Sequence, residues 1–301
     1  DISTVSLQNN SIYIYSKDTS GTSTNPQIIN NTNITATGKN NYGIYSAGYV
    51  VNNGNMNLAA GTGNIGVYSI KAGTIENRNS TITVGGSVPG EDEYGLGMAA
   101  GYTWTKKDLE KPISQRPEQT TGNIINRGTI NVNGASSIGI GHLHNIQAVY
   151  AGGIINVAGA SSVGVYTEVA TRPVLAGNKD DHGQTNTTGN IVGTETVEVS
   201  GDIKVSGTGS SDIVVGKKGI GVYAEKSKVK FNSDYGVEVK DGGTGVFVKN
   251  DGSNIIPSGA NTLKLKYSGS NVGTGVGIYY EGATGSNIIN GTKVKLVDTL
   301  A

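Results

Sequence analysis

The chain of 301 residues lacks cysteine, has few charged residues and contains no long apolar run. Without cysteine it forms neither disulfides nor thiolate metal sites, which fits a secreted bacterial surface protein. Basic and acidic residues number 23 each and together make up 15% of the sequence, so no overall positive field attracts nucleic acid. No apolar run reaches the roughly 18 residues of a membrane-spanning helix. The chain begins with Asp1 and shows no signal peptide, so we expect a piece of a longer protein.

Segments with Leu, Ala, Glu and Lys at helical spacing are also missing, whereas glycine is abundant at 47 residues. Much of this glycine belongs to a recurring phrase of glycine, a β-branched residue and an aromatic residue. The copies are Gly43-Ile44-Tyr45, Gly66-Val67-Tyr68, Gly164-Val165-Tyr166, Gly221-Val222-Tyr223, Gly245-Val246-Phe247 and Gly277-Ile278-Tyr279. Weaker copies at Gly97-Met98 and Gly139-Ile140 lack the tyrosine, and in residues 11–15 the glycine itself is replaced. A repeat of fixed period is typical of a solenoid.

A second phrase, Asn-x-Gly-x-Ile-x-Val, precedes the glycine phrase and is clearest in residues 126–132. Both phrases alternate apolar and polar residues, which predicts half-buried strands separated by short Gly/Asn/Ser turns. Successive glycine phrases are about two dozen residues apart, the length of one three-stranded solenoid coil. Two longer intervals predict insertions near residues 102–122 and 168–196, the second followed by an extra strand pair around 197–205.

These patterns predict an all-β fold, a parallel β-solenoid (right-handed β-helix) of about ten coils with two loop insertions, forming a single domain over residues 1–301. We expect one column of core residues at Ile34, Met56, Ile82, Ile130, Ile155 and Ile203. We expect a second column at Ile44, Val67, Met98, Ile140, Val165, Val222, Val246 and Ile278. The aromatic residues that follow this second column should point outward and form a ladder that is broken near Ala99 and Gly141. Such a ladder either stabilises the sheet or offers a platform to a sugar or a protein.

Several stretches together suggest a family. The repeated GIYS and GVYA segments accompany TIENRNSTITV (74–84), NIINRGTINVNGASSIGIG (123–141) and VGTGVGIYYEGATGSNIINGTKVKLVDT (272–299). In these segments the chain resembles the passenger domains of the large fusobacterial autotransporter adhesins, the RadD-like outer-membrane proteins, over most of its length outside the insertions. The resemblance implies a β-helical stalk on the cell surface, delivered by type V secretion and anchored through a C-terminal β-barrel beyond this fragment. It implies adhesion to, and coaggregation with, other bacteria or host cells through surface proteins or glycans, and no binding motif that transfers to numbered positions.

Motifs for cofactors and metals are weak. Residues 61–66 fit GxGxxG, but a strand rather than a helix follows, so no dinucleotide site is expected. Residues 242–245 resemble a calcium-binding β-roll repeat, but Phe247 stands where aspartate is required. His142 and His144 share one face of a strand, which allows a metal pair but supplies no third ligand. We therefore expect neither a cofactor nor a metal.

Catalytic residues are equally hard to assemble. Glu93, Glu168, Asp180 and Asp181 lie in expected loops, where a carbohydrate-active β-helix enzyme would place carboxylates along an outer groove. No nucleophile, base and orienting residue can be combined from their spacing. We expect a non-enzymatic protein without catalytic residues, with a carbohydrate-active enzyme as the alternative.

The first insertion holds the candidate residues for binding a partner. It contains the only tryptophan of the chain among aromatic and basic residues, a mixture suited to contacting a protein or glycan surface. These candidates are Tyr102, Trp104, Lys106, Lys107 and Arg116. The alternative is an elaboration that covers a coil edge. The second insertion, with Arg172, Pro173 and His182, is the weaker candidate.

The sequence thus predicts a fragment of a bacterial cell-surface adhesin that displays loops on a rigid rod. The rival interpretation is a purely structural stalk segment, with binding located elsewhere in the parent protein.

Overall fold

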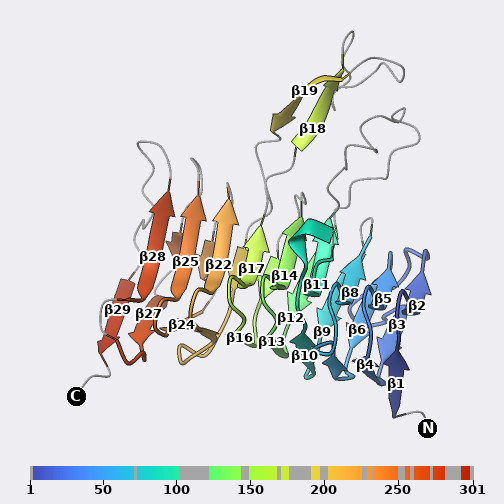
Figure 1. Cartoon of the computed structure of the whole chain (residues 1–301), viewed down its shortest axis with the longest axis horizontal. Helices are drawn as coiled ribbons and strands as arrows, with labels where there is room; N and C mark the ends of the chain where they lie inside the picture. Colours follow the sequence, from blue (N-terminus) through green and yellow to red (C-terminus); the bar gives the residue numbers. More distant parts are fainter. Residues whose placement is uncertain are drawn as a thin grey trace.

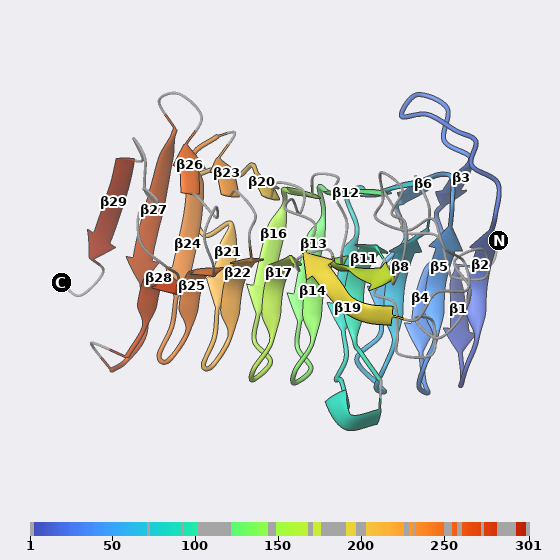
Figure 2. The same ribbon diagram turned by 90° about the horizontal axis from the view of Figure 1, so that it is seen from above.

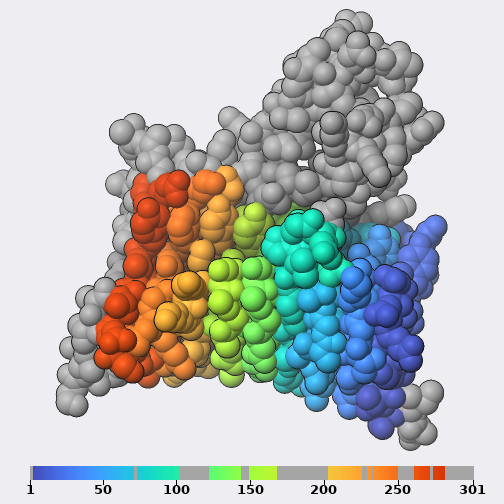
Figure 3. All heavy atoms as spheres, viewed as in Figure 1, coloured from blue at the N-terminus to red at the C-terminus, as the bar shows by residue number. Residues whose placement is uncertain are grey.

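The computed structural model describes residues 3–70, 73–91, 93–101, 122–143, 149–167, 171–175, 191–196, 203–225, 229–231, 233–249, 255–257, 261–271, 274–281 and 293–298. Within these residues, parallel strands stack into three long sheets, with β1 and β29 at opposite ends of the rod (Figure 1). Figure 3 shows the coils as successive bands along the long axis. The predicted all-β parallel solenoid is confirmed, and its ten rungs in sheet A match the expected number of coils.

Each complete coil contributes one strand to each of the three sheets, which we name A, B and C. Sheet A contains β1 (Thr4–Leu7), β4 (Asn33–Ala36), β7 (Met56–Asn57), β10 (Thr81–Val84), β13 (Thr129–Val132), β16 (Ile154–Val157), β21 (Ile213–Val215), β24 (Tyr235–Val239), β27 (Thr262–Tyr267) and β29 (Lys293–Asp298). Sheet B contains β2 (Ile12–Ser16), β5 (Tyr42–Ser46), β8 (Ile65–Ser69), β11 (Leu96–Gly101), β14 (Ile138–Leu143), β17 (Val163–Thr167), β22 (Ile220–Glu225), β25 (Thr244–Lys249) and β28 (Val276–Glu281). Sheet C contains β3 (Ile28–Asn30), β6 (Tyr49–Asn52), β9 (Thr74–Asn77), β12 (Asn123–Asn126), β15 (Val149–Ala151), β20 (Ile203–Val205), β23 (Val229–Phe231) and β26 (Ile255–Pro257).

A single helical segment, the 3₁₀ turn η1 (Pro89–Glu91), interrupts the strands of the described chain and projects between β10 and β11 (Figure 2). No helix in these residues has the length and apolar character needed to span a bilayer.

The core column predicted from the glycine phrases is confirmed. Its members, from Ile44 through Val67 and onward to Ile278, pair rung by rung along sheet B. From Ile44 to Val246 they are at most 1% exposed. Each rung therefore buries its apolar side chain on the rung before it, and no coil has a core of its own.

The other predicted column is correct for five residues and wrong for the sixth. Ile34, Met56, Ile82, Ile130 and Ile155 are in register along sheet A. The next rung is Ile213, whereas Ile203 lies in sheet C beside Val149. The physical reason is that alternation identifies inward residues but not the sheet to which they belong, and residues 201–205 carry the same Gly-x-Ile-x-Val pattern.

The repeated glycine of sheet B is required by close packing between coils. At seven consecutive rungs, from Gly43 to Gly245, a Cβ atom would lie within 2.6 Å of the carbonyl oxygen of the next glycine in the column. It would also press on inward side chains such as Val132 and Ile130 at the Gly139 rung. Tyr13 occupies this position in β2, an edge strand of sheet B.

A buried row of asparagines closes the corner between sheets C and A in the first coils. Asn30, Asn52, Asn77 and Asn126 end successive sheet C strands, and each is at most 3% exposed. The amide nitrogen of each donates to the side-chain oxygen of the next, at 2.8, 3.1 and 2.9 Å. Asn126 ends the row by donating to the Gly152 carbonyl oxygen at 2.6 Å. The row satisfies polar groups that the tight corner would otherwise bury unpaired.

Both long intervals of the sequence begin after a strand of sheet B. Residues 102–121 follow β11 and lie outside the described residues, and the second interval begins just after β17. That interval contains an antiparallel pair, β18 (Thr171–Leu175) and β19 (Ile191–Thr196), which is separate from the three sheets (Figure 1). Within 197–205 the structure describes only β20, the sheet C strand of the following coil, and residues 197–202 of the extra strand pair predicted there lie outside the described residues.

Candidate binding surface

The outer face of sheet B carries a stack of aromatic rings, which we call the aromatic column. It consists of Tyr15, Tyr45, Tyr68, Tyr166, Tyr223, Phe247 and Tyr279. The rings of Tyr45 and Tyr68 are 5.4 Å apart at their centroids and 6° from parallel, and those of Tyr166 and Tyr223 are 5.1 Å apart. The outward ladder predicted from the sequence is therefore present, and Tyr15 extends it by one rung.

This geometry decides how a partner can meet the column. Because neighbouring rings stack along the rod, they cover each other's faces and turn their edges outward. A sugar cannot stack on a ring face inside the column, where only ring edges and hydroxyl groups are open to contact. Burial raises the pKa of Tyr45 and Tyr223, so these hydroxyls stay neutral at physiological pH and serve as hydrogen-bonding groups.

A second line of apolar residues runs beside the column. It starts every sheet B strand except β25, which begins with Thr244, and comprises Ile12, Tyr42, Ile65, Leu96, Ile138, Val163, Ile220 and Val276. Ile65, Leu96, Tyr68 and Ala99 form a buried apolar cluster of their own, separate from the solenoid core. The outer face of sheet B thus carries an apolar stripe, which is buried at Ile65, Leu96, Tyr68 and Ala99.

The stripe is most exposed at its two ends. The break in the column lies at Ala99 and Gly141, as predicted. Ala99 is fully buried and Tyr68 only 9% exposed, and the Tyr68 hydroxyl donates to the Gly101 carbonyl oxygen. By contrast, Tyr15 is 53% and Tyr279 45% exposed. The most accessible aromatic rings therefore lie at the two ends of the column and not beside the break.

The predicted partner-binding residues Tyr102, Trp104, Lys106, Lys107 and Arg116 all lie outside the described residues. Their segment begins directly after Gly101 of β11, the strand that contains Ala99. The attachment point is therefore next to the break in the column, and the role of these five residues stays a prediction.

The second insertion is described only at its base. Arg172 and Pro173 lie on β18, in register with Glu195 and Thr194 of β19. Asp180, Asp181 and His182 fall outside the described residues, as does Glu168.

The histidine pair is divided between the described and undescribed parts of the chain. His142 is fully buried on β14, in register with Ala100 and Thr167, and His144 lies outside the described residues. Where the structure is described, no group of three or more metal-ligating side chains gathers. The expectation that no metal is bound stays a prediction.

Glu93, a candidate acid from the sequence, joins neighbouring coils. Its carboxylate meets the Lys39 ammonium at 2.7 Å and accepts a hydrogen bond from the Thr62 hydroxyl at 2.5 Å. Lys39, together with Thr62, holds the pKa of Glu93 below its usual range. A carboxylate stabilised in its charged form by fixed partners suits a structural role better than proton transfer.

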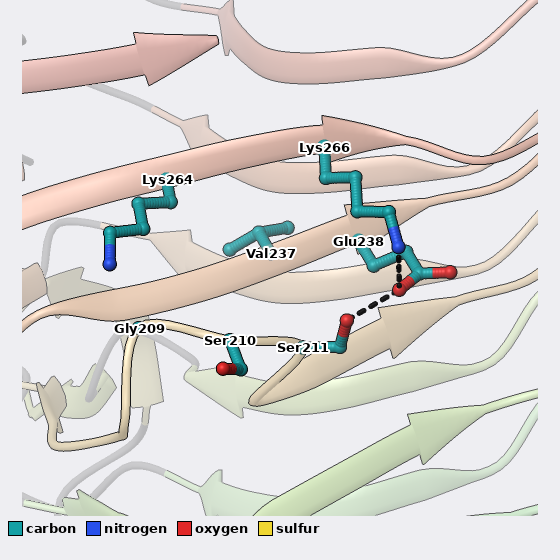
Figure 4. Close-up of a pocket in the computed structure, with 7 residues that line it drawn as sticks. All are labelled: Gly209, Ser210, Ser211, Val237, Glu238, Lys264 and Lys266. Atoms are coloured by element: carbon teal, nitrogen blue, oxygen red, sulfur yellow. Dashed lines mark hydrogen bonds and ion pairs between the residues drawn. The ribbon is translucent and has the colours of Figure 1, made fainter. Parts of the chain in front are cut away.

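A hollow of about 390 Å³ opens on the outer face of sheet A (Figure 4). It is lined by Gly209, Ser210, Ser211, Val237, Glu238, Lys264 and Lys266. Glu238 accepts from the Ser211 hydroxyl at 2.5 Å and from the Lys266 ammonium at 3.3 Å, while Lys264 turns away and pairs with Asp234 at 3.5 Å. Burial alone would raise the pKa of Glu238, but hydrogen bonds from Ser211, Ser268 and Lys266 lower it. The lining contains one carboxylate, whereas glycoside hydrolysis by acid and base needs two.

One charged cluster on sheet C was missed from the sequence. Glu76 lies between Arg78 and Arg127 on neighbouring rungs, with Tyr49 and Tyr150 beside them. A signal was present, because the phrases at 74–84 and 123–141 both place Asn-Arg at the end of equivalent strands, β9 and β12. Residues two apart in a strand share a face, so Glu76 and Arg78 could have been paired from spacing alone.

Comparison with known proteins adds no relative: no family model matches the chain, and neither a curated protein nor a solved structure matches it.

Proposed function

We propose that this chain is a non-enzymatic adhesive rod, a segment of a bacterial cell-surface adhesin that binds proteins or glycans on other cells. The observation that carries the proposal is the apolar stripe along the outside of sheet B, with exposed aromatic edges at both ends. Exposed apolar surface gathered on one face of a protein marks interaction sites. The resemblance to fusobacterial autotransporter passengers points to the same activity.

The arrangement suits binding by presentation. The stacked coils fix every tyrosine edge at a set height along the rod, so a partner meets a rigid surface that loses little conformational entropy on binding. Tyrosine combines a large apolar area with a hydroxyl group, the combination found in binding hot spots. The insertions leave from the edge of the same sheet, where they would add contacts to the stripe.

The first experiment measures binding of the purified, labelled chain to bacterial and host cells. The double variant Tyr15→Thr/Tyr279→Thr removes the two exposed ends of the column. We expect binding to weaken about tenfold or more, as for the loss of hot-spot residues. The control is Ile154→Thr, because Ile154 is 46% exposed and belongs to sheet A; it should bind as the unchanged chain does.

A second comparison separates the stripe from the insertions. Deleting residues 104–117 removes the predicted loop, and deleting 177–190 removes a similar length between β18 and β19. Reduced binding in the first deletion alone assigns part of the contact to Trp104 and its neighbours. If the unchanged chain binds no cell, the proposal fails in favour of a structural stalk. New reducing ends released from polysaccharides would instead establish the carbohydrate-active enzyme.

A further inference from the structure

The charged cluster on the outer face of sheet C has the construction of an anion-binding site. Glu76 lies on β9, Arg78 follows that strand, and Arg127 follows β12 on the next rung. The backbone bond from the Arg127 N–H to the Asn77 carbonyl oxygen, at 2.8 Å, fixes this spacing. The two guanidinium groups therefore sit on neighbouring rungs, about 4.8 Å apart along the rod at their backbones.

The Glu76 carboxylate binds both arginines on their buried side. Its carboxylate accepts from Arg78 Nε at 2.9 Å, Arg78 Nη2 at 2.8 Å, Arg127 Nε at 3.1 Å and the Tyr49 hydroxyl at 3.1 Å. Four bonds occupy the acceptor sites of a carboxylate. The Glu76 side chain is only 5% exposed, whereas those of Arg78 and Arg127 are 39% and 53% exposed. The acid is thus out of reach of a partner, and the outer edges of the arginines are open to one.

The Arg127 guanidinium is also fixed from the side. Its central carbon lies 5.1 Å from the centroid of the Tyr150 ring, in cation–π contact. Nε is bound to Glu76, so the terminal nitrogens remain to meet a ligand. An arginine oriented in this way presents the fork that binds carboxylate or sulfate with two parallel hydrogen bonds.

The positive charge continues along the same face. Lys204 and Lys230 follow Tyr150 in register on β20 and β23. Glu76 is the only acidic residue in the eight strands of sheet C. Arg78, Arg127, Lys204 and Lys230 are thus distributed over five rungs, about 19 Å of rod.

The linear arrangement selects the ligand. A small anion would contact the arginine pair alone, whereas a chain with anions at intervals would engage the whole line. We propose that the outer face of sheet C binds a linear acidic polysaccharide, with Arg78 and Arg127 holding its carboxylate or sulfate groups and Lys204 and Lys230 continuing the contact. This site is separate from the stripe on sheet B, and its test uses no cells, so either proposal can fail without the other.

The test is titration of the purified chain with a heparin oligosaccharide at low and at physiological salt. The unchanged chain should bind, and more weakly as salt rises, because a polyanion releases counterions on binding. Arg127→Gln/Lys204→Gln should weaken binding by at least about tenfold, the value of one charge-assisted hydrogen bond. Lys264→Gln/Lys266→Gln on sheet A makes the same change in net charge and should alter the affinity by less than about twofold.

A further variant protects the test against misfolding. Lys204→Gln/Lys230→Gln leaves the bonds of Glu76 intact and should also weaken binding. If the sheet A and sheet C variants lost equal heparin affinity, net charge alone would explain the binding, and the proposal would be overturned. Absence of heparin binding by the unchanged chain, displacement of heparin by an equal concentration of inorganic sulfate, or tighter binding of polyglutamate of the same charge would also overturn it.

Discussion

Alanine in place of Gly139 would drive a methyl group into the backbone of the next coil. The new Cβ would lie 2.6 Å from the Gly164 carbonyl oxygen and 3.0 Å from Val132 Cγ2. Such contacts are not found below 3.0 Å, so the rungs must separate by at least 0.4 Å at this point. The parallel pairing of β14 with β17 resists the movement on both sides of the glycine, at Ile138 and at Ile140.

The same strand provides a matched control. A Cβ added at Gly141 would meet Leu96 Cδ2 at 3.5 Å and Ala99 Cβ at 3.8 Å, which are ordinary contacts. Overpacking at Gly139 should cost about 2–3 kcal/mol. Gly141→Ala should instead stabilise by about 0.4–1 kcal/mol, because alanine restricts the unfolded chain more than glycine does.

The two variants should therefore differ by about 3 kcal/mol in free energy of unfolding. The assay is urea unfolding followed by circular dichroism, with melting temperatures as a second readout; the difference corresponds to about 6 °C or more. Equal stabilities for Gly139→Ala and Gly141→Ala would refute the argument that contact between coils, rather than backbone freedom, selects glycine in this column.

Three further outcomes can be measured on the same chain. Asn77→Ala should destabilise by about 3 kcal/mol, because it removes the bonds from Asn52 and to Asn126 and leaves the Asn126 side-chain oxygen buried without its donor, whereas exposed Asn53→Ala should cost less than about 0.5 kcal/mol in urea unfolding. The hydroxyl of Tyr235 is buried with no hydrogen-bond partner among the described residues, so Tyr235→Phe should be neutral or stabilising by up to about 1 kcal/mol. Burial raises the pKa of Tyr235, so the neutral hydroxyl contributes folding stability below about pH 10, the pKa of tyrosine in the unfolded chain, and this contribution is lost at higher pH. In an alkaline titration, Tyr235→Phe should therefore lose less free energy of unfolding than the unchanged chain. Hydrogen bonds from Arg78 lower the pKa of Glu76, so the ionised carboxylate contributes folding stability above about pH 4.3, and this contribution is lost on acidification. Glu76→Gln should therefore make the free energy of unfolding depend less on pH in the acid range, and an unchanged dependence would contradict this.

The sheet B strands could be predicted because three signals coincide in them. The glycine marks the close approach of coils, the next residue is a core rung, and the tyrosine is the outward ring. Met98 and Ile140 kept their place in the column even where the tyrosine was absent, because the glycine was still there. Strand assignment was less certain elsewhere, since Ile203 and Ile213 both follow the alternating pattern and only the three-dimensional register separates them.

The candidate sites were harder to predict for a different physical reason. Binding surfaces on a solenoid combine residues that are one coil apart, so Glu76 and Arg127 meet although 51 positions separate them. Sequence spacing between coils varies with every insertion, and the pairing of rungs has to be known before such a cluster can be recognised. The arginine pair was visible only as a repeated Asn-Arg at equivalent strand ends.

The parallel stacking of the coils also determines how the rod responds to a pulling force. The bonds between rungs run close to the long axis, and β1 and β29 lie at opposite ends. Tension applied through the ends therefore loads the bonds of one terminal rung at a time, and coils detach in order. Each released coil of about two dozen residues exchanges about 4.8 Å of rod for about 80 Å of extended chain. A cell held by such a rod would be carried on a tether that lengthens in steps and dissipates energy at each one.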